Sequence, residues 1–215
     1  MLLSTFERRL LIDHFKVPEQ LLYLSQFHYP DLTHPSSSLT SPTFQDRDHF
    51  VFIGNFRHSP NFDAVSWLKK SIWPLIRKEL PEAQAHIYGA YPSKEMMDLT
   101  AKEMGFHVLG HTPDQYITLQ KYRINLAPLR FGAGIKGKIS DAWWCGTPTL
   151  STQIGFEGMA DDYNLQAYTG QSPEDFALKA VELYKDETMW KEAQSLGFRI
   201  LQAHYSKKIT YVGIQ

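Results

Sequence analysis

The sequence predicts an α/β fold in which a doubly wound parallel sheet of about six strands carries helices on both faces. Short apolar runs alternate with amphipathic stretches from residue 50 onward, which is the pattern of successive right-handed βαβ units. Strands connected in this way form a parallel sheet that helices cover on both sides. Of the 215 residues, 43% are hydrophobic and 21% are charged, so the chain can bury a core of this kind.

Each predicted strand is followed by a predicted helix or turn. Apolar runs predict strands at 50–54, 85–89, 107–110, 124–129, 148–152 and 165–169. Helical periodicity predicts helices at about 61–80, 92–104, 113–121, 137–145 and 173–204, and a turn runs through IGFEGM after the fifth strand. Pro74 predicts a kink or break in the first of these helices, because proline lacks a backbone donor and clashes with the preceding turn.

The N-terminal part of the chain differs from the rest. Apolar residues at helical spacing predict a helix over 4–15, with Ser4 as its N-cap and Glu7 completing a capping box. Residues 29–44 are rich in Pro, Ser and Thr and show no periodicity, which is typical of a linker or surface loop. We therefore expect residues 47–215 to form the compact domain and the residues before them to lie outside it.

Charge and cysteine content exclude several classes of protein. The formal net charge is -1, so the chain has no general electrostatic attraction for nucleic acid or for an anionic membrane, and any anion site has to be local. Cys145 is the single cysteine, which excludes an intrachain disulfide and a cysteine-rich zinc site and fits a reducing compartment. No apolar segment is as long as a membrane span, and the N-terminus lacks the apolar core of a signal peptide.

The segment GAGIKGK, which begins at Gly132, matches two phosphate-binding motifs imperfectly. Gly132, Gly134 and Gly137 spell G-x-G-x-x-G, the dinucleotide fingerprint, and Glu157 follows at about the spacing of its acidic residue. That fingerprint belongs to the first βα turn of its domain, whereas about three βα units precede this loop. The segment also spells G-x-x-x-x-G-K, but Ile139 stands where a Walker loop needs Ser or Thr. A third interpretation also stays open, in which the glycines only turn the chain and the lysines are solvated.

The position of this loop in the predicted fold favours a phosphate site. The loop follows the strand at 124–129 and precedes the helix at 137–145. In doubly wound sheets, ligands bind at the carboxyl ends of the strands, where the free N–H groups of helix N-termini favour anions. The glycines let the backbone approach a ligand, and Lys136 and Lys138 add positive charge.

The wider context resembles one enzyme family. The segment PLRFGAGIKGKISDAWWCGTPTLSTQIGFEGM is similar to the pattern PLRFGAGxKxKxxEAxxxGxPVxxTxxGxEG, which is common in one branch of the retaining glycosyltransferases of family four, also called glycosyltransferases group 1. FVFIGNFRHSPNFDAVSWL resembles the first strand and helix of that family's nucleotide-sugar domain. STFERRLLIDHF with LLYLSQFHYP resembles the last helix and strand of its acceptor domain. The resemblance covers nearly the whole chain.

This resemblance implies a GT-B glycosyltransferase of the hexosyltransferase type, built from two Rossmann-like domains. Residues 47–215 would be its C-terminal domain, which binds the nucleotide-sugar donor, and residues 1–46 would be a remnant of the acceptor domain with a linker. The donor would be a nucleotide-diphosphate sugar linked to UDP or GDP, and no further cofactor and no metal is implied. The acceptor would be a glycan, a polysaccharide or a lipid-linked saccharide, and nucleic acid is not an expected partner.

The resemblance also implies roles for individual residues. Lys138 and Arg57 would act on the leaving diphosphate as catalytic groups, and Asp141 would accept hydrogen bonds from the ribose hydroxyls. The backbone of residues 109–112, which include His111, would meet the base. The implied donor-binding residues are Gly54, Asn55, His111, Gly132, Gly134, Ile135, Lys136, Asp141 and Glu157. Each has a structural alternative: Lys138 as a solvated lysine, Arg57 in a surface ion pair, and Asp141 as an acid that only favours the helix dipole.

Two departures from the family pattern leave questions open. The first of the family's paired glutamates corresponds to Ala133, so no carboxylate holds the donor sugar in the usual way and the sugar stays undetermined. Most of the acceptor domain is absent, so we expect it in cis or from another chain. A cytoplasmic location is expected, and a place at the inner face of a membrane stays open.

Two other functions fit parts of the sequence. A non-catalytic nucleotide-sugar-binding or interaction module would keep the donor site without transfer, and an NAD-binding domain would prefer NAD to UDP or GDP. The packing of the helix at 4–15 distinguishes two of these interpretations, part of an enzyme and a stand-alone module. An apolar face left unpacked indicates that more protein belongs against it, whereas a well-packed face indicates a stand-alone module.

Overall fold

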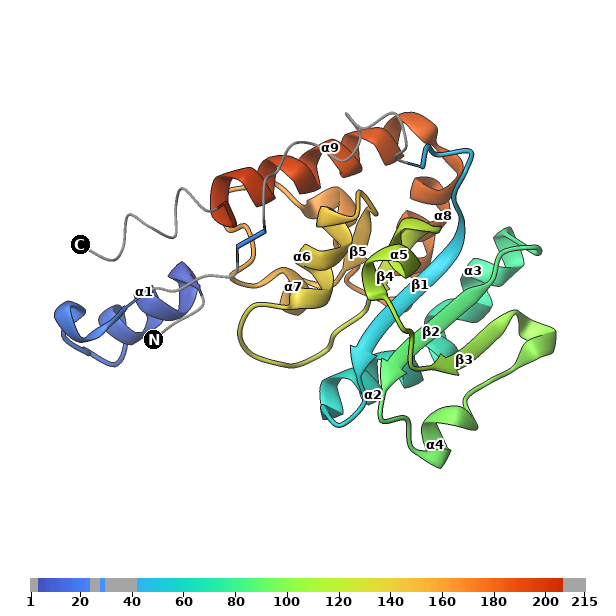
Figure 1. Ribbon diagram of the computed structural model, residues 1–215, viewed down its shortest axis with the longest axis horizontal. Coiled ribbons are helices and arrows are strands. Elements are labelled where there is room, and N and C mark those ends of the chain that lie inside the picture. The colour runs from blue at the N-terminus through green and yellow to red at the C-terminus, as the bar shows by residue number, and fades with distance from the viewer. Residues whose placement is uncertain (1–3, 24–27, 30–41, 207–215) are drawn as a thin grey trace.

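A five-stranded parallel sheet forms the centre of the fold in the computed structural model, which describes residues 4–23, 28–29 and 42–206 (Figure 1). In the sheet the strand order is β3-β2-β1-β4-β5, so the order reverses between β1 and β4. Parallel pairing between all neighbouring strands confirms the predicted α/β class. The strands are β1 (Asp48–Asn55), β2 (Ala85–Ala90), β3 (Phe106–Gly110), β4 (Tyr122–Ala127) and β5 (Thr149–Ser151).

The predicted sixth strand is reduced to a single bridge. Residues Gln166–Tyr168 form a turn of 3-10 helix, and Thr169 alone makes a parallel bridge to Ser151. Side chains occupy the backbone groups that a strand would use. Asn164 accepts a hydrogen bond from the Gln166 N–H, and Lys179 donates to the carbonyl oxygens of Gln166 and Thr169. These side-chain bonds, two of them from α8 (Pro173–Lys185), replace a ladder, so the sheet has five strands where about six were predicted.

The helices follow the predicted order with more interruptions. The predicted helix at 92–104 is broken, because Ala101 pairs with Phe106 as an antiparallel bridge. The long tract from residue 173 divides at Asp186, whose side chain accepts from the backbone N–H groups of Thr188 and Met189 and so begins a new helix. The helices between and after the strands are α2 (Ser59–Trp67), α3 (Trp73–Glu79), α4 (Lys94–Met97), α5 (Gln115–Gln120), α6 (Gly137–Trp144), α7 (Gln153–Phe156), α8 (Pro173–Lys185) and α9 (Glu187–His204).

The predicted break near Pro74 takes the form of a π-helical segment. Leu68–Ile72 form this segment, and it joins α2 to α3. Proline cannot donate the hydrogen bond of a regular α-helix and clashes with the carbonyl group of the preceding turn, so the turn before it widens. Leu68 and Ile72 are nonetheless fully buried, so the widened turn keeps its apolar face on the core.

Helices pack on both faces of the sheet, as predicted. On one face Phe50 of β1 contacts Trp73 of α3 edge-on, with ring centroids 5.8 Å apart. On the other face Val51 belongs to a smaller buried cluster with Ala142 of α6 and Cys145, the residue that caps the C-terminus of α6. The alternation of Phe50 and Val51 is the period of two expected of a strand that is buried on both sides.

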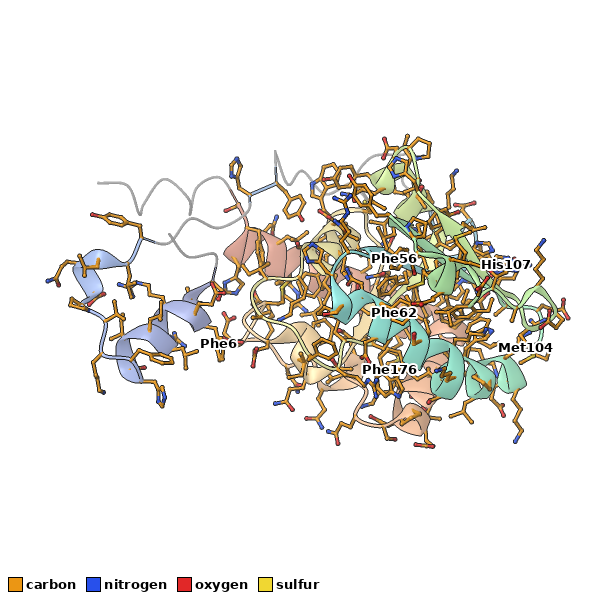
Figure 2. All side chains as sticks on the ribbon, turned by 90° about the horizontal axis from the view of Figure 1, so that it is seen from below. Phe6, Phe56, Phe62, Met104, His107 and Phe176 are labelled. Atoms are coloured by element: carbon orange, nitrogen blue, oxygen red, sulfur yellow. The ribbon has the colours of Figure 1, made fainter. Side chains whose placement is uncertain are left out.

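The N-terminal helix α1 (Thr5–Asp13) confirms the predicted helix and its cap. The Ser4 side chain accepts a hydrogen bond from the Glu7 N–H at 3.0 Å. Figures 1 and 2 show α1 at one end of the molecule, where Phe6 lies on the side toward the α7 region. No residue of α1 itself is buried, and Leu10 is 45% exposed. In the part of the chain that the structure describes, no helix is long and apolar enough to cross a bilayer.

Candidate functional site

A cavity of about 430 Å³ opens at the carboxyl ends of the strands, beside the point where the strand order reverses. Ligands of doubly wound sheets bind at this position. The ends of β1 and β2, the segment after β3, and helices α5 and α6 all contribute to its wall. The lining residues are Ile53, Gly54, Asn55, Gly89, Ala90, His111, Thr112, Pro113, Gln115, Leu119, Lys138 and Asp141.

Two glycines form the strand side of this cavity, where the backbones come close together. A Cβ atom on Gly89 would lie 2.1 Å from the carbonyl oxygen of Gly54, closer than any real contact. A Cβ atom on Gly54 would lie 2.9 Å from the Asn61 side chain. Glycine at both positions is therefore required for this packing, and it leaves the strand ends as an open backbone surface.

Lys138 enters the cavity from the first turn of α6. Its ammonium donates a hydrogen bond to the side-chain oxygen of Asn61 and lies 4.6 Å from the centre of the Phe52 ring. Removal from water lowers the pKa of Lys138 to about 7. No side chain caps the N-terminus of α6, so its free N–H groups and Lys138 together present a local positive charge, although the whole chain is nearly neutral.

Asp141 lies one turn further along α6 and lines the same cavity. Its Oδ1 accepts a hydrogen bond from the Tyr29 hydroxyl at 2.7 Å, and its Oδ2 accepts one from the Gln115 side-chain amide at 3.2 Å. Burial raises the pKa of Asp141, and these two hydrogen bonds act in the opposite direction. The carboxylate is thus held in one orientation by groups from two other parts of the chain.

Five of the implied site residues line the cavity, whereas Gly132, Gly134 and Ile135 of the glycine loop do not. Gly132 and Gly134 have φ angles of 135° and 74°, which are conformations that favour glycine. Ile135 is partly buried and packs against the main core. The implied residues that line the cavity are Gly54, Asn55, His111, Lys138 and Asp141.

Lys136 and Glu157 lie away from this cavity. The Lys136 ammonium lies 3.4 Å from the Glu157 carbonyl oxygen and donates to it, and the Lys136 N–H contacts the sulfur of Met159 at 3.3 Å. Burial lowers the pKa of Lys136. Glu157 lines a separate hollow of about 460 Å³ beside α7. This pair therefore ties the loop before α6 to the segment after α7.

Arg57 is exposed and does not line the cavity. The Arg57 guanidinium stacks on the ring of Tyr91, 3.6 Å from its centre. The backbone N–H of Arg57 donates to the Asn55 side-chain oxygen at 2.9 Å. Tyr91 has a φ of 57°, unusual for an aromatic residue, and this turns the ring outward beside Arg57. Arg57 follows the cavity residue Asn55 by two positions, and its guanidinium packs on Tyr91 outside the cavity wall.

Three residues of this site were not identified from the sequence: Tyr29, Asn61 and Gln115. Asn61 directly follows Pro60 in the first turn of α2, a position where a polar side chain often contacts backbone groups, so a local signal existed. Gln115 lies in the first turn of α5, after Asp114, whose side chain caps that helix. Tyr29 falls in a segment interpreted as linker, and no local pattern connects it with α6. Among the described residues, no group of three or more His, Cys, Asp or Glu side chains could hold a metal ion.

The sequence profile described as Glycosyl transferases group 1 matches residues 47–186 of this chain. The chain belongs to this family. The match confirms the resemblance inferred from the GAGIKGK segment and its surroundings. A Klebsiella pneumoniae protein described as an uncharacterized 44.6 kDa protein in the cps region is 25% identical over 171 residues, which are 76% of this chain and 44% of that protein.

Solved structures of glycosyltransferases share the fold of this group 1 chain. S. aureus TarM, solved as a variant with fondaparinux, alpha-GlcNAc-glycerol and UDP, superposes with a TM-score of 0.78 at 15% identity, over 99% of this chain and 42% of TarM. WaaG, a glycosyltransferase involved in lipopolysaccharide biosynthesis, gives 0.70 at 14% identity, over 100% of this chain and 62% of WaaG. Pneumococcal GtfA, solved with UDP and GlcNAc, gives 0.64 at 18% identity, over 98% of this chain and 43% of GtfA. The chain thus spans less than half of TarM, GtfA and the Klebsiella protein.

Proposed function

We propose that this chain is the donor-binding half of a metal-independent, retaining glycosyltransferase that takes sugar from a nucleotide-diphosphate sugar. One observation carries the proposal: Lys138 and Asp141, one helical turn apart on α6, line the same cavity at the carboxyl ends of the strands. A cation at a helix N-terminus suits a diphosphate, and a carboxylate one turn deeper suits a ribose diol. Family membership and the UDP bound in the TarM and GtfA structures support UDP as the first candidate, with GDP as the second.

Lys138 would stabilise the leaving group during transfer. As the bond between sugar and diphosphate breaks, negative charge builds on the diphosphate, so fixed donors near it stabilise the transition state more than the ground state. Arg57 would add a second positive charge after leaving Tyr91. Lys136 and Glu157 would hold the glycine loop before α6 in place from outside the cavity, and the hydrogen bond between them is consistent with this role.

The acceptor half would come from further protein. The described residues supply one wall of a cleft, and transfer needs the acceptor hydroxyl held against the sugar carbon in a closed, dry site. The exposed Leu10 of α1 and Phe15, which follows that helix, favour a surface that packs against more protein over a stand-alone module. The acceptor would be a glycan, polysaccharide or lipid-linked saccharide, and the reaction would take place in the cytoplasm.

Isothermal titration calorimetry with UDP and GDP tests the donor site directly. We expect one of the two to bind equally well with and without EDTA, and Lys138→Ala to weaken binding by about 1 to 3 kcal/mol, the scale of a lost charged hydrogen bond. Lys70→Ala, at an exposed lysine on the segment before α3, is the matched control and should leave binding unchanged.

Three outcomes would count against parts of this proposal. Binding of NAD in place of both diphosphates would indicate a dinucleotide site. Equal losses for Lys138→Ala and Lys70→Ala would mean that Lys138 has no special role. Diphosphate binding without any transfer, even when the full-length protein is supplied with acceptors, would favour a non-catalytic binding module.

A further inference from the structure

Tyr29 lies outside the residues that match the family profile, yet it reaches the candidate donor site. Its hydroxyl lies 2.7 Å from Asp141 Oδ1 and 2.8 Å from the Ser140 side-chain oxygen. The residue is only 8% exposed. A segment more than a hundred positions away in sequence therefore meets α6 at the carboxylate proposed to bind ribose.

Several contacts fix the Tyr29 ring in this place. Its N–H donates to the Tyr205 carbonyl oxygen at 3.0 Å, and Tyr29 forms a parallel bridge with Ser206 just after α9. Its ring stacks on Trp144 of α6, with centroids 5.8 Å apart and planes 23° apart. Backbone and ring are thus held by contacts that do not involve the hydroxyl, and these contacts place the hydroxyl beside the carboxylate.

The hydroxyl proton of Tyr29 goes to Asp141. Two acceptors lie near that proton, Ser140 Oγ at 2.8 Å and Asp141 Oδ1 at 2.7 Å, and the ionised carboxylate is the stronger acceptor, while Ser140 donates its own proton to the Gly137 carbonyl oxygen at 3.1 Å. An ionised carboxylate only accepts, so Tyr29 is the donor at Oδ1 and Gln115 the donor at Oδ2. A hydrogen bond to the charged form favours that form, which offsets the burial of Asp141.

We propose that Tyr29 is a positioning residue for nucleotide binding, which fixes the Asp141 carboxylate in the orientation and the ionised state that ribose hydroxyls require. This inference rests on the proposed function, in which Asp141 binds ribose. It also means that the donor site is not complete within residues 47–186, because one of its supports comes from the segment before β1. Tyr29 is not among the residues that line the cavity, so it acts through Asp141.

The charge state of Asp141 depends on groups from several elements. Tyr29 and Gln115 contact it directly. Burial, and after it the charge of Asp141, raises the pKa of Cys145 and of Tyr29. Loss of the Tyr29 hydroxyl removes a group that favours the ionised form, so the pKa of Asp141 rises further. The titratable and charged groups that line the cavity beside Asp141, or act on Tyr29 or Cys145, are Tyr29, Arg47, His111, Asp114, Tyr116, Lys138 and Cys145.

Tyr29→Phe tests the inference, because it keeps the ring on Trp144 and removes only the hydroxyl. The probes are UDP and 2′-deoxy-UDP, which lacks one ribose hydroxyl, or the matching guanosine pair if the wild-type chain prefers GDP. We expect Tyr29→Phe to weaken UDP binding at pH 7 by about 2- to 10-fold, the worth of one hydrogen bond, and to weaken 2′-deoxy-UDP less. Below pH 7, the loss of UDP affinity should begin at a higher pH than in the wild type, because the pKa of Asp141 is raised further.

Two variants and a melting curve keep the test specific. Tyr122→Phe removes the hydroxyl of another buried tyrosine, 7% exposed, at the amino end of β4, and should leave both affinities and the pH profile unchanged. Asp141→Asn should reduce UDP binding by more than Tyr29→Phe does. Thermal melting of each variant shows whether a change in binding comes from loss of the fold.

The possible results separate the inference from the proposed function. If Asp141→Asn weakens UDP binding while Tyr29→Phe keeps the wild-type affinities and pH profile, Tyr29 is not a positioning residue and the donor site stands. An equal loss of both nucleotides in a folded Tyr29→Phe also overturns the inference, because the effect is then not directed at ribose. If Asp141→Asn has no effect, the proposed ribose role fails and the inference fails with it.

Discussion

The side chain of Asn61 joins the end of β1 to Lys138: its amide nitrogen donates to the Asn55 carbonyl oxygen at 2.7 Å, and its oxygen accepts from the Lys138 ammonium. Asn61 is buried, and its partner Lys138 lies in the cavity wall. A neutral amide can hold an ammonium in place without neutralising it. The positive charge of Lys138 therefore stays available to an anion in the cavity.

The protonation of Lys138 predicts how donor binding changes with pH. Burial lowers the pKa of Lys138 to about 7, so the ammonium is present below that pH and is lost as the pH rises through it. UDP binding should weaken between pH 7 and 9, by at most about tenfold per pH unit. The nucleotide's own second ionisation lies near pH 6 and does not interfere in this range.

Lys138→Arg provides the control for this pH dependence. Arginine keeps its charge throughout the range, so calorimetric titration of the variant should give a nearly constant UDP affinity from pH 7 to 9. If the wild-type affinity is as flat as that of the variant, the charge of Lys138 does not contribute to binding.

Asn61→Leu removes the side-chain oxygen that accepts the hydrogen bond from the Lys138 ammonium, while keeping a side chain of similar size. Without that hydrogen bond the charged form of Lys138 is favoured less, so its pKa falls further and the ammonium is less well placed. We expect UDP affinity at pH 7.5 to drop by about 3- to 10-fold, measured by calorimetry. Asn164→Leu, at an exposed asparagine that does not line the cavity, is the control, and a similar loss there would contradict the role given to Asn61.

Gly89→Ala should destabilise the domain strongly, because the new Cβ would lie 2.1 Å from the backbone oxygen of Gly54. Neither strand can move without disturbing the central pair of the sheet, so we expect a loss of about 2 to 4 kcal/mol in the free energy of unfolding, measured by urea denaturation. Gly137→Ala is the matched control: a Cβ there meets no atom within 4 Å, and alanine favours the helix. Equal stability of the two variants would show that the strand ends are not packed as described.

The order of strands and helices could be predicted because it depends on local patterns. The alternation of short apolar runs with amphipathic stretches follows directly from the periods of strand and helix. The prediction of a sixth strand was wrong because of a contact with a distant part of the chain. The run at 165–169 has the composition of a strand, but Lys179, from a helix later in the chain, takes its carbonyl groups.

The residues of the site also fall into two groups: those that a local motif predicts and those that only the fold brings to the site. Lys138 and Asp141 were found from the motif, because their spacing on one helix is local. Lys136 was predicted to bind the donor and Lys138 to act on its diphosphate, but Lys136 precedes α6 as its N-cap and its ammonium contacts the Glu157 carbonyl oxygen. Tyr29 reaches Asp141 across 112 positions of sequence, and only the folded chain brings the two together.

The domain should lose stability in mild acid through His86, which lies in a row of histidines on neighbouring strands. Its ring contacts those of His49 and His107 edge-on, at 5.7 and 5.2 Å. Its two nitrogens lie 2.7 Å from the Tyr122 hydroxyl and 2.9 Å from the Gln84 side-chain oxygen. A neutral ring satisfies both, because one nitrogen accepts from the tyrosine and the other donates to the glutamine.

Burial, together with repulsion from the two other histidines, lowers the pKa of His86 to about 4. In the unfolded chain a histidine titrates near pH 6.5, so below that pH the unfolded state binds a proton that the folded state does not. The stabilisation is therefore complete above about pH 6.5 and is lost as the pH falls toward 4. We expect His86 to account for a decrease of about 1 to 2 kcal/mol in the free energy of unfolding between pH 7 and 5.

Urea denaturation at a series of pH values measures this contribution as a difference between variants. His86→Gln cannot titrate and keeps one donor and one acceptor, so its stability should fall less steeply between pH 7 and 5 than that of the wild type. His58→Gln, at an exposed histidine before α2, controls for the loss of a histidine elsewhere and should follow the wild-type curve. Parallel curves for wild type and His86→Gln would mean that another group, and not His86, causes the acid sensitivity, because carboxylates titrate equally in both proteins.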